Sequence, residues 1–586
     1  MNTTKELNLY FEKVFETLGY DKTLARVSFS ARPEMCDFQL NSAFQIAKIE
    51  HKNPLEIAQN IANAAKNDSF EVVACPPAFV NVTLTNKKLS EIANNFLTSK
   101  NAGVEPHENK KKILVDYGGA NVAKELHIGH LRSAIIGESL KRLYRTLGDE
   151  VVSDSHLGDW GTQMGLTVAQ LEEDGALDFY FSGKGKKPTI TLDMLNDAYP
   201  KASKRKTTDT AFKKKADDYT LFIQNKKEPY YTIYKEIRAV SVKKIAENYK
   251  KLGCEFDLWY GESDAEPFID ETVQIFVDKG LARKSEGALV VDVARDGEHI
   301  PIPKKNPEDK QLYKNPMPPA IIKKANDGEV YATTDLATIL MRNRMFDLDE
   351  IDYVVDDRQS THFEQVFRCA KMSGISPENQ KLLHIAYGKI NGKDGKPFKT
   401  RSGETVKLED VINLLKNTAT DRLEQNDIVG NDELALQIGV AAMKFGDLSN
   451  QIAKDYIFDL DRFLSFEGKT GPFLQYTGAR IKSLLAKAPN FEPKIAIADA
   501  QEKAIIIDIL KLISAYEICY NERSLAPLTV AAYNLASSFS SLYASKRILD
   551  EKDTKKKISL LSLSKLVLKE LEIALFVLGI EVPERM

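Results

Sequence analysis

The chain has 586 residues, a formal net charge of −3, 28% charged residues and 43% hydrophobic residues. This composition is ordinary for a soluble globular protein of roughly three to five domains, and no run approaches the roughly 18 apolar residues of a membrane span. The N-terminus lacks a secretory signal, and the five cysteines contain no CxxC pair. We therefore expect no membrane association, no thiolate metal site and a cytoplasmic location.

The first region, residues 1–107, mixes short helices with a late pair of strands, which predicts a small α+β domain. Phe79 and Asn81 lie in the second strand, where an aromatic ring beside an amide can stack on and hydrogen-bond an unpaired RNA base. The alternative is a strand that buries Phe79 in the core, because residues 79–82 alternate in polarity.

Residues 108–410 alternate strand-like runs with helices, which predicts an α/β domain with a parallel sheet. The predicted strands are Ile113–Tyr117, Val151–Ser153, Ala288–Val293, Ile351–Val355 and Leu382–Tyr387. A mostly helical stretch over about 170–250 interrupts this alternation as an insertion. Within it, residues 201–250 hold fourteen Lys and Arg against six Asp and Glu, a surface that suits either an RNA backbone or solvent.

From residue 411 to the end of the chain at 586, strand signals disappear and long periodic helices remain, so we expect an all-α bundle. Gln475, Tyr476 and Arg480 lie on one of these predicted helices, where their side chains can reach the phosphates and bases of an RNA.

The most informative run begins after the strand at 113–117 and leads into a long amphipathic helix. A strand-to-helix turn of this kind attracts phosphate, and open α/β sheets bind ligands at this end of their strands. The predicted nucleotide site comprises Ala120, Asn121, Val122, Ala123, Lys124, Glu125, Leu126, His127, Ile128, Gly129 and His130.

Three residues of this turn suit phosphate and nucleotide chemistry. His127 and His130 can each donate an N–H to phosphate or ribose oxygens, and Gly129 lets a base or ribose approach the backbone. Lys124 and Arg132 add positive charge nearby. Two histidines at this spacing also arise by chance as ordinary turn residues, but the strand–turn–helix setting favours a nucleotide site.

Residues 127–130 read His-Ile-Gly-His, and we call them the HIGH run. The HIGH run followed by a helix resembles the first signature of class I aminoacyl-tRNA synthetases. The fuller string over 120–133 resembles that of arginyl-tRNA synthetases. The resemblance continues in His156–Gln163, Gly261–Ser263, Tyr331–Ala337, Arg358–Phe363 and Phe466–Arg480. It implies a Rossmann-type catalytic domain over 108–410, an added N-terminal domain that reads the tRNA elbow, and a helical domain over 411–586 that contacts the stem and the anticodon.

The same resemblance implies an arginine site. Tyr331, Asp335 and Gln359 match residues that bind the arginine side chain, and Asp116 and Asn121 match residues that approach its backbone groups. A carboxylate suits the guanidinium, which offers a planar fork of N–H donors. Without the resemblance, Tyr331 and Asp335 would be interpreted as an ordinary helix start.

A glycine- and lysine-rich loop over 392–403 follows the last predicted strand. In class I synthetases a KMSKS loop at this place clamps the triphosphate. Here Pro397 and Thr400 stand at its two lysine positions, so Lys396, Lys399, Thr400 and Arg401 are the candidate ATP contacts. Lys124 resembles a lysine that compensates for such a degenerate loop.

The resemblance implies an arginine–tRNA ligase that forms arginyl-adenylate from arginine and ATP and transfers arginine to the terminal 2′-hydroxyl of tRNA(Arg). His127, His130 and Lys124 would stabilise the phosphate in the transition state. Mg²⁺ is expected to accompany ATP, and the chain is expected to be a monomer. The alternatives are a class I synthetase for another amino acid, a non-catalytic tRNA-binding paralogue and a small adenylyltransferase that shares only the HIGH run.

Overall fold

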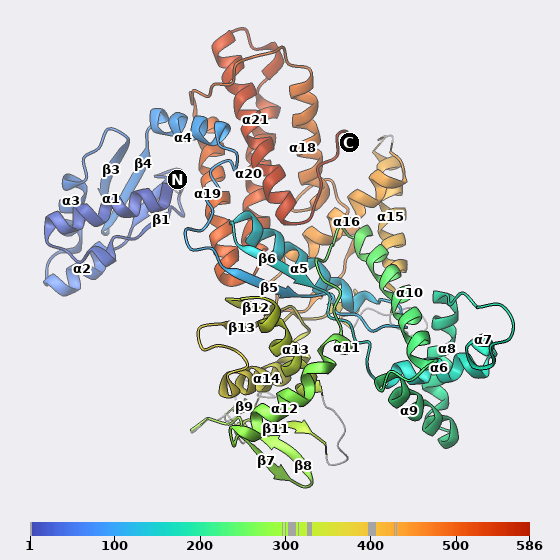
Figure 1. The fold of residues 1–586 in the computed structure, drawn as a ribbon. Coiled ribbons are helices and arrows are strands. Elements are labelled where there is room, and N and C mark those ends of the chain that lie inside the picture. Colours follow the sequence, from blue (N-terminus) through green and yellow to red (C-terminus); the bar gives the residue numbers. More distant parts are fainter. Residues whose placement is uncertain are drawn as a thin grey trace.

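A computed structural model describes residues 3–586 except 296, 299, 303–311, 315, 325–330, 397–405, 427 and 429. Figure 1 shows three parts: a small N-terminal α+β domain, a central parallel sheet with helices on both sides, and a tall helical bundle at the C-terminus. The expected combination of α/β and all-α architecture is confirmed. In the described part of the chain no helix is long and apolar enough to cross a membrane.

The N-terminal domain packs helices on one antiparallel sheet with strand order β1-β2-β4-β3. Its strands are β1 (Val27–Phe29), β2 (Phe38–Leu40), β3 (Phe70–Cys75) and β4 (Phe79–Leu84), and its helices are α1 (Thr3–Leu18), α2 (Ala43–Glu50), α3 (Pro54–Ala64) and α4 (Asn86–Thr98). The predicted late strand pair is β3 and β4. The three-residue strands β1 and β2 are too short for an alternating pattern to predict them.

The central sheet contains four parallel strands in the order β13-β12-β5-β6. They are β5 (Lys112–Asp116), β6 (Glu150–Asp154), β12 (Glu350–Tyr353) and β13 (Lys381–His384). Four of the five predicted strands are therefore confirmed, with ends that differ by at most three residues. After β5 the chain adds β6 on one side of it, and later it adds β12 on the other side. The strand order therefore reverses between β5 and β12, and open α/β sheets bind ligands at such a point.

The helices of this domain carry the predicted motifs. They are α5 (Ile128–Thr146), α6 (Thr162–Glu173), α11 (Glu262–Ala265), α12 (Ile269–Asp278), α13 (Tyr331–Met345) and α14 (Ser360–Ser373). Gly148, with a φ of +89°, follows α5 and turns the chain towards β6. The HIGH run thus lies at the turn from β5 into α5, as predicted.

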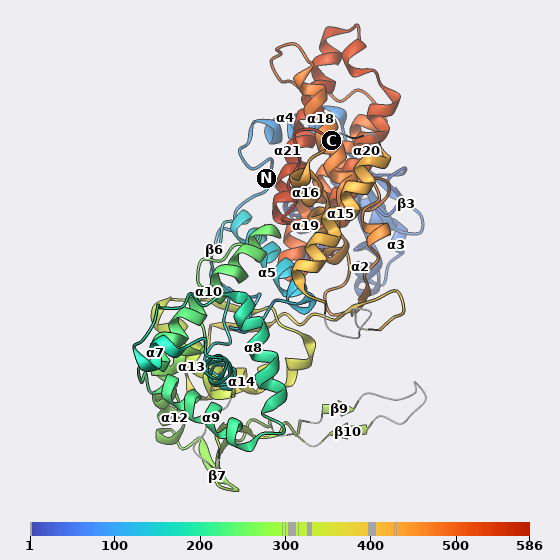
Figure 2. The same cartoon turned by 90° about the vertical axis from the view of Figure 1, so that its right-hand side faces the viewer.

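The predicted strand over 288–293 does not belong to the parallel sheet. It forms β8 (Ala288–Val291), which lies in an antiparallel sheet with β7 (Ala282–Ser285) and β11 (Ala320–Lys323). Glu286 and Gly287 both have positive φ, and two such residues make the tight turn of a hairpin. This turn pairs β8 with its immediate predecessor in the chain. A second pair, β9 (Ile300–Ile302) and β10 (Leu312–Lys314), projects from the lower part of the molecule in Figure 2.

The insertion is helical, as predicted. It contains α7 (Asp178–Ser182), α8 (Leu192–Arg205), α9 (Thr210–Gln224) and α10 (Tyr230–Lys251). The end of α10 returns to the sheet, where Asp257 and Leu258 donate their N–H groups to the Ser153 carbonyl. The insertion is therefore fixed to β6 at its exit.

The C-terminal part is a helical bundle. Its helices are α15 (Leu408–Gln425), α16 (Asp432–Leu448), α17 (Leu460–Phe463), α18 (Gly471–Ala486), α19 (Ala500–Glu522), α20 (Ala526–Ser545) and α21 (Thr554–Val577). A two-residue strand pair, β14 (Ile390–Asn391) with β15 (Tyr456–Ile457), joins this part to the central sheet region. One continuous apolar core extends from the N-terminal domain through α5 to α21.

Candidate active site

A cavity of about 410 Å³ opens at the carboxyl ends of β5 and β12. This volume suits a small-molecule ligand. The cavity is lined by all five predicted arginine contacts and by part of the predicted nucleotide site, namely Asp116, Asn121, Tyr331, Asp335 and Gln359 for the former and Ala120, Asn121, His127, Gly129 and His130 for the latter. The predicted nucleotide and arginine sites therefore share one pocket.

The two histidines cap the N-terminus of α5. The backbone N–H of Gly129 donates to His127 Nδ1 over 3.0 Å, and the backbone N–H of His127 donates to His130 Nδ1 over 3.1 Å. A ring nitrogen that accepts a backbone N–H carries no proton, so the neutral ring holds its proton on Nε2. Both imidazoles therefore keep an Nε2–H donor for a ligand.

The surroundings keep both imidazoles neutral. Burial, followed by the neighbouring His127 and Lys124, lowers the pKa of His130 to about 3, and burial also lowers the pKa of His127. The two rings lie 4.0 Å apart. Gly129 has a further role, because a Cβ there would come within 2.8 Å of the His127 ring. The glycine thus makes room for the capping ring itself.

Asp116 ends β5 and faces a shared cation. Arg342 from α13 donates Nη2 over 2.7 Å to both Asp116 and Asp154, the last residues of β5 and β6. The Arg342 side chain is fully buried. Burial raises the pKa of Asp116, although the charge of Arg342 opposes this shift. Arg342 therefore holds together two strand ends at the edge of the pocket.

Asp335 lies one turn after the start of α13, in contact with a second histidine. Asp335 Oδ2 is 2.5 Å from His362 Nε2 on α14, and both side chains are partly exposed to the pocket. Tyr331 begins α13 and is 78% exposed, so its side chain lies at the rim of the pocket. Gln359 ends the 3-10 turn Asp357–Gln359 that precedes α14. These three predicted arginine contacts meet on one wall.

Some residues of the pocket were not predicted as site residues. They include His156, Glu262, Arg358 and His362. Neither ring nitrogen of His156 has a hydrogen-bond partner among the described residues, and burial raises the pKa of Glu262. Each belongs to a block that resembles the arginyl family, but nothing in the local sequence shows that these blocks converge.

The two cations that flank the HIGH run do not line this pocket. Lys124 Nζ lies 4.6 Å from the centre of the Tyr199 ring on α8, towards the insertion. Arg132 is 1% exposed, donates to the carbonyls of Gly388 and Lys454, and pairs with Asp447 on α16. The expectation that Arg132 adds charge to the site is wrong, because its guanidinium is used to join α5 to the C-terminal part.

The basic loop lies largely outside the described residues, including Pro397, Lys399, Thr400 and Arg401. Lys396 is described and exposed. The chain that follows the loop pairs with the HIGH run itself: Ile128 donates its N–H to Val406, and Leu408 donates to Leu126. Lys407 Nζ lies 2.5 Å from Glu125. The exit of the loop is thus fixed to the start of α5, and Lys407 is a basic residue that the sequence did not single out.

The predicted RNA contacts differ in accessibility. Phe79 is partly buried against Phe44, while Asn81 is buried and bonded to Gln39 and Cys75. Gln475 is fully buried and donates to the Glu581 carbonyl of the C-terminal tail.

Tyr476 and Arg480 form a partly exposed pair on α18. The Arg480 guanidinium lies 4.4 Å from the centre of the Tyr476 ring and 5.4 Å from that of Tyr543 on α20. This pair offers an aromatic ring and a cation at a surface, the combination that stacks on bases and binds phosphate.

Three family models match the chain in succession. They are described as Arginyl tRNA synthetase N terminal domain over residues 5–84, tRNA synthetases class I (R), catalytic domain over residues 92–460, and DALR anticodon binding domain over residues 474–586. The pocket lies within the second of these matches, and Tyr476 and Arg480 lie within the third.

Curated relatives match along the full length. The chain is 40% identical to an arginine–tRNA ligase of Alkaliphilus oremlandii, with 99% of each chain covered, and 38% identical to one of Francisella tularensis subsp. novicida, with 100% of each covered. Solved structures share the fold: the arginyl-tRNA synthetases of Plasmodium falciparum (TM-score 0.81, 23% identity, 100% and 99% coverage) and Thermus thermophilus (TM-score 0.78, 21% identity, 100% coverage of both). The chain therefore belongs to the arginyl-tRNA synthetase family of class I tRNA synthetases.

Proposed function

We propose that the pocket at the ends of β5 and β12 is where this arginine–tRNA ligase forms arginyl-adenylate from arginine and ATP. The observation that carries this proposal is one cavity lined both by the His127–His130 cap and by Asp335. The first offers N–H donors to phosphate at a helix N-terminus, and the second offers a carboxylate to a guanidinium. Activation requires these two groups side by side, because the carboxylate of arginine attacks the α-phosphorus of ATP.

On the amino-acid side, Asp335, Tyr331 and Gln359 bind the arginine side chain, and Asp116 and Asn121 approach its backbone groups. Asp335 selects for a planar guanidinium, since lysine cannot form the bidentate pair with a carboxylate. Uncharged citrulline would leave the carboxylate without its cation, at a cost of several kcal/mol. Glu262, which lines the same pocket, adds a second carboxyl group for a substrate that carries two positive groups.

On the nucleotide side, His127 and His130 donate Nε2–H to the phosphates as charge develops, while Gly129 leaves room at the turn. Lys396, Lys399, Thr400 and Arg401 supply further contacts to the triphosphate, and Lys124 adds its charge once its side chain turns from Tyr199 towards the pocket. Mg²⁺ binds with ATP and neutralises phosphate charge. Three carboxylates of the pocket, Asp116, Asp335 and Asp356, each contact a basic side chain, and Glu262 accepts from the backbone N–H of Trp160, which fits an ion held mainly by the nucleotide.

The second step transfers arginine to the 2′-hydroxyl of the terminal adenosine of tRNA(Arg) and releases AMP. Tyr476 and Arg480 bind the tRNA through the C-terminal domain, and Phe79 contacts it from the N-terminal domain. The amides of Gln475 and Asn81 are buried and bonded within the protein, so they do not contact the RNA. The five cysteines are all free, which fits a cytoplasmic location, and we propose that the enzyme acts as a monomer.

A charging assay with labelled arginine tests this function. The enzyme should charge tRNA(Arg) whose terminal adenosine is 3′-deoxy and fail with the 2′-deoxy form. Stable charging of the 2′-deoxy form would contradict attack by the 2′-hydroxyl, and absence of charging with unmodified tRNA(Arg) would contradict the whole proposal.

A further inference from the structure

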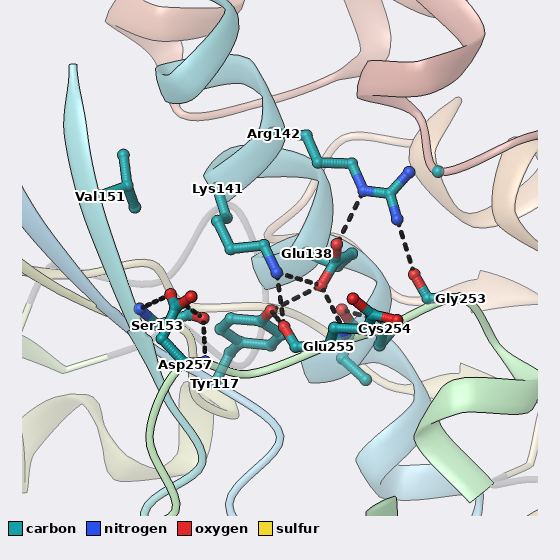
Figure 3. A network of polar contacts seen from close by, with 12 residues as sticks. Tyr117, Glu138, Lys141, Arg142, Val151, Ser153, Gly253, Cys254, Glu255 and Asp257 are labelled. Atoms are coloured by element: carbon teal, nitrogen blue, oxygen red, sulfur yellow. Dashed lines mark hydrogen bonds and ion pairs between the residues drawn. The ribbon is translucent and has the colours of Figure 1, made fainter. Parts of the chain in front are cut away.

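Glu138 is a buried carboxylate in the middle of α5 that accepts hydrogen bonds from four donors. Tyr117 Oη lies 2.7 Å from it, Lys141 Nζ 2.8 Å, Arg142 Nε 2.7 Å and the backbone N–H of Glu255 3.1 Å. Its side chain is 2% exposed. Figure 3 shows these donors converging on it from α5, from the end of β5 and from the segment after α10. No step of the proposed reaction uses Glu138.

One of these donors belongs to the wall of the pocket. Tyr117 directly follows Asp116 and lines the cavity. Its ring packs against Phe256 at 4.4 Å and against Gly137, where a Cβ would lie 2.1 Å from the ring. The contact with Glu138 fixes the hydroxyl end of the same ring. Tyr117 is therefore held along its whole length, and its backbone continues into the chain that leads to the HIGH run.

Another donor reaches the C-terminal domain. Arg142 Nη1 donates over 3.1 Å to the carbonyl of Phe576 in the last turn of α21, and Nη2 donates over 2.9 Å to Gly253. The guanidinium also lies 4.9 Å from the centre of the Phe576 ring. Lys444 from α16 donates over 2.6 Å to the carbonyl of Gly579. The end of α21 is thus bound by cations from two helices, one of which begins at the HIGH run.

We propose that Glu138 is a positioning residue for the active site. It fixes Tyr117 in the wall of the pocket, and through Arg142 it connects that wall to the C-terminal end of α21. This inference rests on the proposed function, because the pocket must be the site of activation. The path runs from Phe576 through Arg142 and Glu138 to Tyr117 in three direct contacts. The simpler alternative is a buried ion pair that only stabilises the fold.

The charges explain why a conservative change would disturb this path. Burial raises the pKa of Glu138, but the charges of Lys141 and Arg142 outweigh burial and bring this pKa below its ordinary value. The carboxylate is therefore ionised at neutral pH. Glutamine has the same shape but only one acceptor oxygen, so it cannot satisfy Arg142 on one side and Tyr117 with Lys141 on the other. The loss of one such hydrogen bond lets the wall of the pocket move. A small displacement of the reacting groups is enough to lower the rate.

The first experiment compares Glu138→Gln, Tyr117→Phe and the double variant in arginine-dependent ATP–pyrophosphate exchange with tRNA present. We expect Glu138→Gln to lower kcat about 10-fold and to change the KM for arginine less than about 3-fold. Tyr117→Phe should lower kcat about 3- to 10-fold, and the double variant should fall within about 2-fold of Glu138→Gln, because both changes remove the same link.

The matched control is Glu502→Gln. Glu502 is also a buried carboxylate, and it accepts from Lys546 and from the backbone N–H of Ala498, but it lies within the C-terminal bundle. This variant should lower the melting temperature and leave kcat of exchange unchanged. If Glu138→Gln lowers only the melting temperature, as the control does, the role is structural and the proposal fails.

The link to α21 is tested with Arg142→Met and Arg142→Lys. Lysine keeps a cation beside Glu138 but cannot reach Glu138 and Phe576 together. We expect kcat to fall in both variants, because both break the contact with α21. The two lowered kcat values should lie within about 3-fold of each other. Full activity in Arg142→Lys would overturn the α21 part of the proposal. Absence of arginine-dependent exchange in the parent enzyme would instead contradict the proposed function.

Discussion

Asp335 and His362 meet in the lining of the pocket with 2.5 Å between Oδ2 and Nε2, although they are 27 positions apart in the chain. The contact joins the second turn of α13 to the first turn of α14. It fixes the carboxylate that we assign to the guanidinium, and such fixed carboxylates recognise arginine with little cost in side-chain entropy. Specificity in this enzyme therefore depends on how the two helices meet.

Replacement of this carboxylate should separate arginine binding from ATP binding. Asp335→Asn should lower kcat/KM for arginine in ATP–pyrophosphate exchange by about 10³-fold or more, because the buried ion pair with the substrate is lost. ATP binding, measured by equilibrium dialysis, should change less than about 3-fold. Exchange at the parent rate in this variant would remove Asp335 from the arginine site.

The neutral state of His130 should be visible in the pH dependence of stability. The pKa of His130 is about 3 in the folded chain, against 6.5 for an ordinary histidine. Below pH 6.5 the unfolded chain takes up a proton that the folded chain refuses, so this contribution to stability is complete above pH 6.5 and is lost as the pH falls towards 3.

The measurement is urea unfolding of the parent and of His130→Asn between pH 8 and pH 5. The variant should lose less stability than the parent over this range, because asparagine does not titrate. Its exchange rate should also fall about 10²-fold or more, since one Nε2–H donor to phosphate is lost. Equal pH dependence in the two proteins would contradict the neutral cap.

A buried carboxyl in the C-terminal bundle should cost stability at neutral pH. Glu570 on α21 is fully buried, and neither of its oxygens has a hydrogen-bond partner among the described residues. Burial raises the pKa of Glu570 well above its ordinary value. Because Glu570 ionises at a lower pH in the unfolded chain than in the folded chain, its contribution to stability is most favourable below about pH 4.5 and becomes less favourable as the pH rises.

Glu570→Gln should therefore stabilise the protein at pH 7 by about 1–3 kcal/mol, with no gain at pH 4, as measured by urea unfolding. Glu502→Gln is the opposed control, because Glu502 is buried but paired with Lys546 and should lose stability at pH 7. A loss of stability in Glu570→Gln at pH 7 would contradict a destabilising buried carboxyl at this position.

The Tyr476–Arg480 pair should contribute to tRNA binding. Arg480→Ala should raise the KM for tRNA about 10-fold and reduce the salt dependence of binding by about one phosphate contact, since one cation at the surface is removed. Saturating tRNA should restore kcat. An unchanged salt dependence in a filter-binding assay would place the tRNA elsewhere on the C-terminal domain.

Much of the fold is predictable because its elements are strongly patterned. Buried apolar runs predict the four strands of the parallel sheet, and the HIGH run lies at the expected turn. The strand predicted over 288–293 lies outside the parallel sheet, because an apolar run predicts that a strand is buried but not which strand it pairs with. Its pairing depends on the hairpin turn at Glu286 and Gly287, which both have positive φ, and apolar periodicity does not predict that turn.

The site was only partly predictable, because partners distant in the chain decide what each side chain does. Arg132 stands beside the HIGH run, yet Asp447 and the Gly388 carbonyl bind it from far along the chain. Gln475 lies on a suitable helix, but its amide faces the C-terminal tail. His362 carried no local signal for its contact with Asp335. Residue type and spacing predict the chemistry of a site, whereas orientation requires the tertiary structure.

The central claim is that one pocket activates arginine with ATP. ATP–pyrophosphate exchange measures that step, with arginine, lysine or glutamine as the substrate and with or without tRNA(Arg). We predict exchange with arginine in the presence of tRNA(Arg) that exceeds exchange with lysine or glutamine by about 10³-fold or more. No exchange with arginine in the presence of tRNA(Arg), or equal exchange with lysine, would contradict the account.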